Sequence, residues 1–134
     1  MNDKLRRLVR RRARLRCEYC GLPETDSPVT PHHVEHIVAN KHHGPTRSSN
    51  LALSCHRCNL NKATDLSGLD PVTGKLTKLF HPRRHQWSHH FRWDSYWLVG
   101  KTAIGRTTVD VLRVNETERI RLRETLDELG RFPW

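Results

Sequence analysis

The sequence contains no long apolar run and only a small share of apolar residues. Across its 134 residues, no stretch approaches the roughly 18 consecutive apolar residues that a membrane helix needs. The N-terminus also lacks the apolar segment of a signal peptide, so we expect a cytoplasmic protein. Only 35% of the residues are apolar, which predicts a modest core that needs an additional staple.

Acidic side chains are scarce as well: 14 of them face 24 lysines and arginines, which gives a formal charge of +10. Such a surface repels itself unless it meets a polyanion, and nucleic acid is the commonest one. Leu5, Leu8 and Val9 recur at helical spacing, which predicts an amphipathic helix over residues 3–15 with basic outer faces. The alternative is a solvated basic face that binds nothing. The basic residues of this region are Arg6, Arg7, Arg10, Arg11, Arg12, Arg14 and Arg16.

The chain has only four cysteines, and they form two close pairs, Cys17 with Cys20 and Cys55 with Cys58. In a reducing cytosol, paired cysteines at this spacing are more naturally metal ligands than disulfides. Four thiolates fill a tetrahedral zinc site and leave no open position, so we predict a structural zinc ion. Gly21 suits the tight turn of a metal knuckle. Buried free thiols and two disulfides are the alternatives.

The remaining sequence predicts short strands and helices separated by turns. The patterns favour strands over residues 33–38 and 50–54, a helix over 56–64, a turn at 70–74, a hairpin within 93–99 and a final helix capped by Asn115. We find no internal repeat and no low-complexity linker. We therefore expect residues 67–134 to pack on the rest as part of a single domain.

Three sequence elements follow one another in a recognisable order: His32-His33-Val34-Glu35-His36-Ile37, then Ser49-Asn50-Leu51, then Cys55-His56-Arg57-Cys58-Asn59-Leu60-Asn61-Lys62. This order resembles the HNH endonuclease family. The tail, with Leu-Phe-His-Pro-Arg-Arg, further resembles small stand-alone bacterial HNH proteins. The resemblance implies an α+β fold with a ββα-metal core over residues 17–66, a basic helix over 1–16 and a C-terminal extension over 67–134.

The resemblance also implies a role for each signature residue. His36 would be the general base, because an imidazole can accept a proton from water at neutral pH. Glu35 and Asn59 would hold a catalytic ion, and their hard oxygen ligands favour Mg²⁺ or Mn²⁺. Asn50 would join the hairpin to its loop by hydrogen bonds. Adjacent strand residues point to opposite faces, so Glu35 and His36 can serve one site only at a strand end or a kink.

Other residues of this region are weaker candidates. Lys62 is a candidate phosphate contact. His33, on the same strand face as Glu35, would assist the metal or substrate or else have no role. The default interpretation of the other nearby histidines is that they lie on the surface; they are His32, His42, His43 and His56. The sequence departs from the usual family pattern at Glu35, at the loop His42-His43-Gly44-Pro45 and at Ala63.

Residues 80–93 interleave aromatic and basic side chains. Such a segment suits stacking on bases and contact with phosphates, but Phe80, Trp87, Phe91 and Trp93 are equally suited to pack as core. The candidate nucleic-acid contacts along the chain are Lys62, Arg10, Arg11, Arg12, Arg83 and Arg84.

The sequence thus predicts a metal-dependent endonuclease that nicks DNA with little sequence specificity, as a monomer or homodimer. RNA is not excluded as a substrate. The alternative is a zinc-stabilised nucleic-acid-binding module that has lost catalysis. Retention of Glu35, His36 and Asn59 together favours the nuclease.

Overall fold

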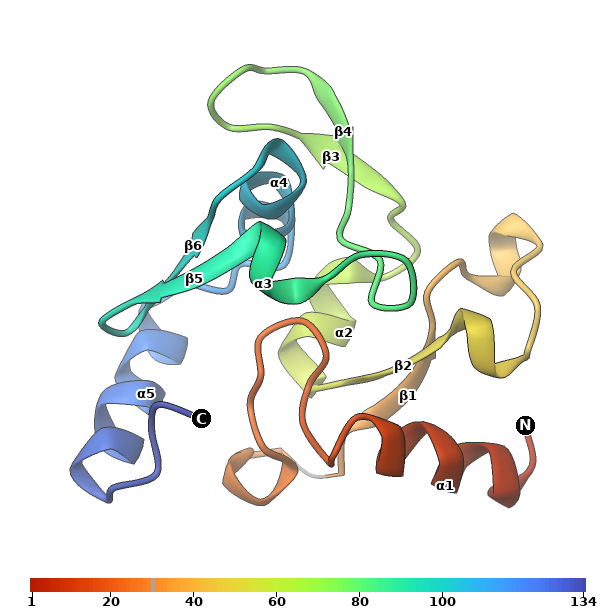
Figure 1. Cartoon of the computed structure of the whole chain (residues 1–134), viewed down its shortest axis with the longest axis horizontal. Helices are drawn as coiled ribbons and strands as arrows, with labels where there is room; N and C mark the ends of the chain where they lie inside the picture. The colour runs from red at the N-terminus through yellow and green to blue at the C-terminus, as the bar shows by residue number, and fades with distance from the viewer. Residues whose placement is uncertain (30) are drawn as a thin grey trace.

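The computed structural model describes residues 1–29 and 31–134. Over these residues the chain combines helices with three two-stranded antiparallel sheets (Figure 1). The helices are α1 (Asp3–Arg12), α2 (His56–Lys62), α3 (Trp87–His90), α4 (Ala103–Val111) and α5 (Thr117–Glu128). The strands are β1 (His33–His36), β2 (Leu51–Ser54), β3 (Ser67–Leu69), β4 (Leu76–Lys78), β5 (Phe91–Asp94) and β6 (Trp97–Gly100). Short 3-10 turns occupy Glu24–Asp26, Asn40–His42 and Ser48–Asn50. The predicted α+β class is confirmed, and none of the described helices is long and apolar enough to cross a membrane.

Helix α1 begins at a polar cap and buries one apolar side. The Asn2 Oδ1 accepts a hydrogen bond from the Leu5 amide at 2.8 Å, which satisfies one of the free amides of the first turn. Val9 is fully buried and packs with Leu51 and Leu53 of β2. The predicted amphipathic helix is therefore present, and its buried stripe anchors it to the central hairpin.

The central unit is a ββα arrangement in which β1 and β2 lie between α1 and α2 (Figure 1). The strands pair antiparallel with His36 opposite Leu51 and Glu35 opposite Ala52. Every residue of β2 is buried, so this strand lies in the interior of the fold. Both strands and α2 form where the sequence predicts them, with ends within two residues of the expected positions.

The C-terminal part folds against the cysteine knuckles through a shared apolar core. Phe80, Phe91 and Leu98 belong to one buried cluster with the four cysteines, and the last helices add Leu112 and Leu126. The predicted hairpin near residues 93–99 is confirmed as β5–β6. The predicted turn at residues 70–74 is confirmed between β3 and β4.

Two expectations for this part are corrected. Asn115 does not cap α5, whose N-cap is Glu116; its side chain instead bonds the Leu98 amide at 2.9 Å and the Leu98 carbonyl at 2.8 Å. Helix α4, which the sequence reading did not contain, begins at a Thr102 cap. Gly105 allows α4 to pack closely on the backbone at His90, because a Cβ at this position would stand 2.1 Å from the His90 carbonyl oxygen.

Asp70 ties the β3–β4 turn to α4. Its side chain is fully buried and accepts bonds from the Arg106 Nη2 at 2.8 Å and the Val72 amide at 3.0 Å. The hydrogen bond from Arg106 is the main cause that holds the pKa of Asp70 well below its usual range. In acid, Asp70 binds fewer protons in the native state than in the unfolded chain. The stability that Asp70 contributes is therefore fully present above the ordinary pKa of an aspartate and is lost as the pH falls toward its lowered native pKa.

We accordingly expect the free energy of unfolding of the wild type to decline steeply below about pH 4. The Asp70→Asn variant lacks this titrating group, so its unfolding free energy should be lower near neutral pH and change less in acid. Urea unfolding followed at several pH values between about 2 and 6 measures both curves. Parallel curves for the two proteins would contradict the assignment.

Candidate active site and metal centre

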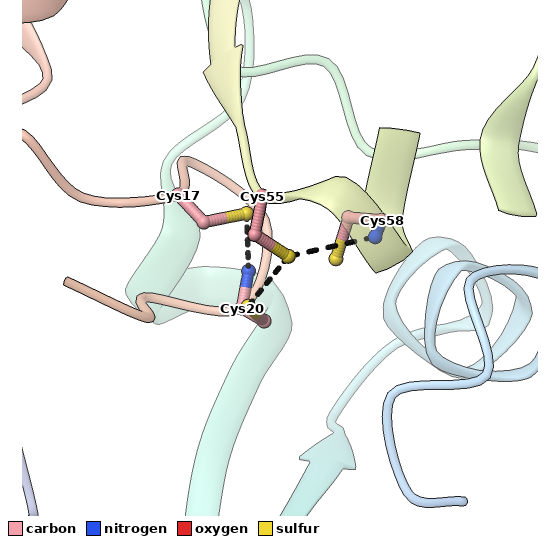
Figure 2. A group of neighbouring side chains, drawn as sticks. All are labelled: Cys17, Cys20, Cys55 and Cys58. Atoms are coloured by element: carbon pink, nitrogen blue, oxygen red, sulfur yellow. Dashed lines mark hydrogen bonds between the residues drawn. The ribbon is translucent and has the colours of Figure 1, made fainter. Parts of the chain in front are cut away.

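The four cysteines come together at one point between β2, α2 and the loop after α1 (Figure 2). Their sulfur atoms all lie within 4.8 Å of one another, and all four side chains are buried. The Cys20 and Cys55 sulfurs are 3.7 Å apart, far from the roughly 2.05 Å of a disulfide bond. Sulfurs around a tetrahedral zinc ion lie about 3.8 Å apart, given Zn–S bonds of about 2.3 Å. The cluster therefore fits a zinc ion, and all four cysteines are free in the structure.

Each cysteine pair forms a knuckle in which a backbone amide points at a sulfur. The Cys20 amide donates to the Cys17 Sγ and the Cys58 amide to the Cys55 Sγ, both at 3.5 Å (Figure 2). Gly21 takes a positive φ of 82°, as the predicted tight turn requires. These amides stabilise thiolates, because they place partial positive charge on the sulfur atoms.

A buried arginine from α5 completes the cysteine cluster. The Arg119 Nη2 donates to the Cys58 Sγ at 3.0 Å and its Nη1 to the Leu112 carbonyl at 2.8 Å. Burial by itself lowers the pKa of Arg119, but the sulfurs of Cys58, Cys20 and Cys55 raise it above its ordinary value. The guanidinium is thus a fixed positive charge beside a site that gathers negative charge. No motif marked Arg119, because a helical arginine 61 residues after Cys58 carries no spacing signal.

Glu35 lies on the face of β1 that points toward α2. It is only 7% exposed, and its Oε1 accepts a hydrogen bond from the Tyr19 hydroxyl at 2.5 Å. Its Oε2 lies 3.6 Å from the Lys62 Nζ. Burial raises the pKa of Glu35 above its usual value, although the Lys62 ammonium and the Tyr19 hydroxyl oppose that shift. Tyr19 was not predicted, and it links the carboxylate to the first cysteine knuckle.

His36 is the last residue of β1, so the condition set by strand alternation is met. The Ile37 amide still bonds the Asn50 carbonyl at 2.8 Å, and the chain then leaves the hairpin. The half-buried ring of His36 places its Nε2 2.8 Å from the Thr46 Oγ1. Thr46 was not predicted; it comes from the loop between the strands and orients the imidazole.

Asn50 joins the hairpin to the loop that carries Thr46. Its Oδ1 accepts from the Val38 amide, and its Nδ2 donates to the carbonyls of Val38 and Pro45, each at 2.9 Å. The loop approaches closely: a Cβ on Gly44 would stand 1.7 Å from the Val38 carbonyl oxygen. The side chain of Asn50 is 5% exposed, so its bonds are shielded from water.

We therefore expect Asn50→Ala to lower the free energy of unfolding by about 3 kcal/mol, because it strands several buried polar groups. Urea unfolding measures this loss. Asn50→Asp, a variant of the same size, sets a buried carboxylate against the Val38 and Pro45 carbonyl oxygens, so near neutral pH it should be at least as unstable as Asn50→Ala. Equal stability of Asn50→Ala and the wild type would show that the loop is held by other contacts.

Asn59 and Lys62 lie on neighbouring positions of one side of α2, because they are three residues apart. The side chain of Asn59 is half-buried and has no hydrogen-bond partner within residues 1–29 and 31–134. Lys62 corrects an expectation: it is 2% exposed and its ammonium donates to the Ile37 carbonyl at 2.9 Å, so it cannot reach phosphate. Lys62 brings α2 against Glu35, whereas no described hydrogen bond links Glu35, His36 and Asn59 directly.

The nearby histidines differ from one another. His32 is buried with its Nε2 2.9 Å from the Leu22 carbonyl oxygen, so its assignment to the surface was wrong. His33 is exposed and its ring centroid lies 5.7 Å from that of His56, which is partly buried. His42 and His43 are exposed, as expected.

The candidate nucleic-acid contacts also divide into two groups. Arg10 forms an ion pair with Glu24, and Arg83 forms one with Glu18, so part of their charge is already balanced. Arg12 donates to the Leu51 carbonyl at 2.8 Å. Two further candidates, Arg11 and Arg84, are exposed and form no ion pair in the described part of the chain.

The aromatic residues divide between core and surface. Phe80 and Phe91 are buried and pack edge to face at a centroid distance of 5.2 Å. Trp87 and Trp93 are partly buried against the same core. The core interpretation thus holds for the two phenylalanines, whereas the tryptophans retain exposed ring surface.

Comparisons with known proteins agree with this geometry. Residues 17–65 match the family model described as HNH endonuclease. The Septu protein PtuB of Bacillus thuringiensis is 38% identical over 71 residues, which cover 53% of this chain and 25% of the relative. The match thus spans about a quarter of the length of that curated relative. No solved structure matches the chain. The segment from residue 17 to residue 65 is therefore similar to the HNH endonuclease family.

Proposed function

We propose that the protein is a metal-dependent endonuclease that hydrolyses phosphodiester bonds of DNA. The observation that carries the proposal is the junction where β1 ends: Glu35 faces α2, His36 follows it at the strand end, and Asn50 fastens the adjoining loop. A strand end, like a kink, allows adjacent residues to serve a single centre. The basic surface supplies the electrostatic attraction to a polyanion.

Within this proposal each side chain has one task. His36 takes the proton of the attacking water, and Thr46 holds its ring in place through the Nε2 contact at 2.8 Å. Glu35 and Asn59 would hold the catalytic ion, because a carboxylate and an amide oxygen are ligands that Mg²⁺ and Mn²⁺ accept. Such an ion, when bound, supplies charge stabilisation for the phosphate and the leaving oxygen. Asn50 acts as a supporting residue.

The cysteine cluster would hold a structural zinc ion apart from this centre. The site fits by its sulfur spacing, its knuckle amides and the positive charge of Arg119. We further propose that residues 1–134 act as one domain, because Tyr19 reaches Glu35 from the knuckle and Arg119 reaches the knuckle from α5. A monomer with one such centre would nick one strand per encounter, with little sequence specificity.

One observation favours a second candidate, a nucleic-acid-binding module without catalysis. The Glu35 carboxylate already has the Tyr19 hydroxyl and the Lys62 ammonium beside it. In a silent module these contacts would be a purely structural buried pair. In an enzyme the same carboxylate must also accept a divalent cation.

Supercoiled plasmid separates the two candidates. Purified protein at low salt should convert plasmid to the nicked circle with added Mg²⁺ or Mn²⁺, and excess EDTA should stop the reaction. Zinc is measured in the same samples, so that loss of the structural ion is not mistaken for loss of catalysis. Plasmid binding without nicking under either metal would overturn the nuclease and support the binding module. A labelled RNA of the same sequence as a DNA control tests the substrate class.

A further inference from the structure

A concave pocket opens beside the first cysteine knuckle, on the edge of β2 that does not pair with β1. On this edge the Glu18 amide donates to the Leu53 carbonyl at 2.9 Å, and the Leu53 amide donates to the Glu18 Oε2 at 2.9 Å. The pocket has a volume of about 410 Å³, within the range of ligand sites. Its lining combines the segment after α1, the knuckle, residues 80–87, β5 and the C-terminal end of the described chain, which lies beside that segment in Figure 1.

The apolar wall of this pocket consists of aromatic rings that are fixed in place. The Trp87 indole N–H donates to the Tyr19 carbonyl at 2.8 Å, and the Trp134 indole N–H donates to the Cys20 carbonyl at 3.3 Å. Trp93 is held by the Arg123 guanidinium, 5.1 Å from its ring centroid. Since two of the three indole donors are already used, these rings offer flat π surfaces more than hydrogen bonds. Such surfaces stack on any nucleobase without selecting its sequence.

The rim of the pocket carries unbalanced positive charge. Arg12, Arg14 and Arg16 line it, and none of them forms an ion pair with any described residue. The one carboxylate of the lining, Glu18, is already paired with Arg83. Burial is the main cause that lowers the pKa of Arg83 to about 10, and repulsion from the nearby charge of Arg12 adds to it. A phosphate chain would relieve this repulsion.

The backbone that carries these arginines is unusual. Arg14 and Leu15 both adopt positive φ values, 56° and 57°, which residues other than glycine rarely adopt in succession. Strained backbone of this kind is maintained by its surroundings and concentrates at binding sites. Here it turns the chain directly after α1, so that Arg14 and Arg16 face the tryptophan pocket.

The pocket also adjoins the hairpin of the candidate active site. Arg12, at its rim, donates to the Leu51 carbonyl at 2.8 Å, and Leu51 pairs with His36 across the hairpin. Arg12 therefore links the rim of the pocket to the hairpin that carries His36.

We propose that this pocket binds an unpaired nucleotide of single-stranded DNA, with the base against Trp87, Trp93 and Trp134 and the neighbouring phosphates on Arg12, Arg14 and Arg16. The inference rests on the proposed function in taking DNA as the ligand and refines it: the substrate is DNA with a single-stranded segment. A base in a duplex is stacked and cannot enter, so the pocket discriminates by strandedness and not by sequence.

Binding tests this inference independently of cleavage. The His36→Ala protein, without added Mg²⁺ or Mn²⁺, is titrated against a fluorescein-labelled 12-nucleotide DNA of mixed sequence and against the same sequence as a duplex. Anisotropy should give at least about five-fold tighter binding of the single strand. The single strand should also quench tryptophan emission, because a stacked base quenches an indole, and the quenching should persist in Trp97→Phe, which removes the exposed indole of β6.

A pair of arginine variants locates the effect. Arg14→Gln combined with Arg16→Gln should weaken single-strand binding by about ten-fold and remove the preference over the duplex. Arg6→Gln combined with Arg7→Gln removes the same amount of charge from the exposed face of α1. This control should weaken the binding of the single strand and of the duplex by the same factor, so the preference for the single strand should remain. Three results would each overturn the proposal: equal binding of the single strand and the duplex by the His36→Ala protein, equal losses of single-strand binding in the two double variants, or tighter binding of a 12-nucleotide RNA of the same sequence than of the DNA. Failure of nicking would leave these binding results unchanged.

Discussion

Replacement of His36 by alanine should reduce metal-dependent nicking by at least about 100-fold. A positioned general base contributes about 10²-fold to 10⁴-fold to a hydrolytic rate, and His36 is the imidazole that stands at the end of β1 beside Glu35. Within residues 1–29 and 31–134 its half-buried side chain hydrogen-bonds Thr46 alone, so alanine removes one hydrogen bond of the fold. The rate of conversion of supercoiled plasmid to nicked circle, with Mg²⁺ or Mn²⁺ in excess, measures the effect.

Two controls separate a chemical effect of His36→Ala from misfolding. The variant should keep the zinc content and the thermal unfolding temperature of the wild type, because His36 is not part of the cysteine cluster. Thr46→Val keeps the size of the threonine but loses its hydroxyl, so it should slow nicking less than His36→Ala does. Equal nicking by the wild type and His36→Ala would exclude His36 as the base.

Removal of zinc should unfold the knuckles and release the C-terminal helices from them. Structural zinc contributes roughly 10–16 kcal/mol in zinc-finger peptides, which is comparable to the roughly 5–15 kcal/mol of unfolding free energy of a whole domain. The cysteines also belong to the main apolar cluster with Leu112 and Leu126. Disorder of the knuckles should therefore disrupt the packing of the C-terminal helices as well. A strong chelator should therefore abolish the cooperative thermal transition seen by circular dichroism, and added Zn²⁺ should restore it.

Arg119 provides a matched control for this zinc prediction. Arg119→Met keeps a long side chain but removes the charge beside Cys58, so zinc should leave the protein faster in the presence of a chelator. Arg119→Lys keeps the charge and should fall between the two. A cooperative transition that persists after complete zinc removal would contradict the structural role of the ion.

Periodicity and spacing predicted the central unit well. Short alternating runs placed β1 and β2, and the cysteine spacing placed both knuckles, because these signals are local. The order of the three sequence elements indicated the family match over residues 17–65. The strand-end condition for Glu35 and His36 also followed from simple alternation.

The sequence could not predict the contacts that depend on long-range packing. Lys62 looked like a surface phosphate contact, yet Glu35 and the Ile37 carbonyl hold its ammonium inside the fold. Helix α4 contains Thr107, Thr108 and Val109, which favour strands locally, and its packing on β6 overrides that preference. Arg119 acts on cysteines that are distant in the sequence, so only the fold reveals it.

The most direct test of the central claim is the affinity of the candidate centre for Mn²⁺, followed by electron paramagnetic resonance in zinc-loaded protein. We predict one Mn²⁺ site per chain in the wild type. The Mn²⁺ affinity should be at least about ten-fold weaker in Glu35→Gln and in Asn59→Ala, and plasmid nicking should be reduced in the same order. Mn²⁺ affinity and nicking that are unchanged in both variants would place the reactive metal elsewhere and contradict the assignment of Glu35 and Asn59.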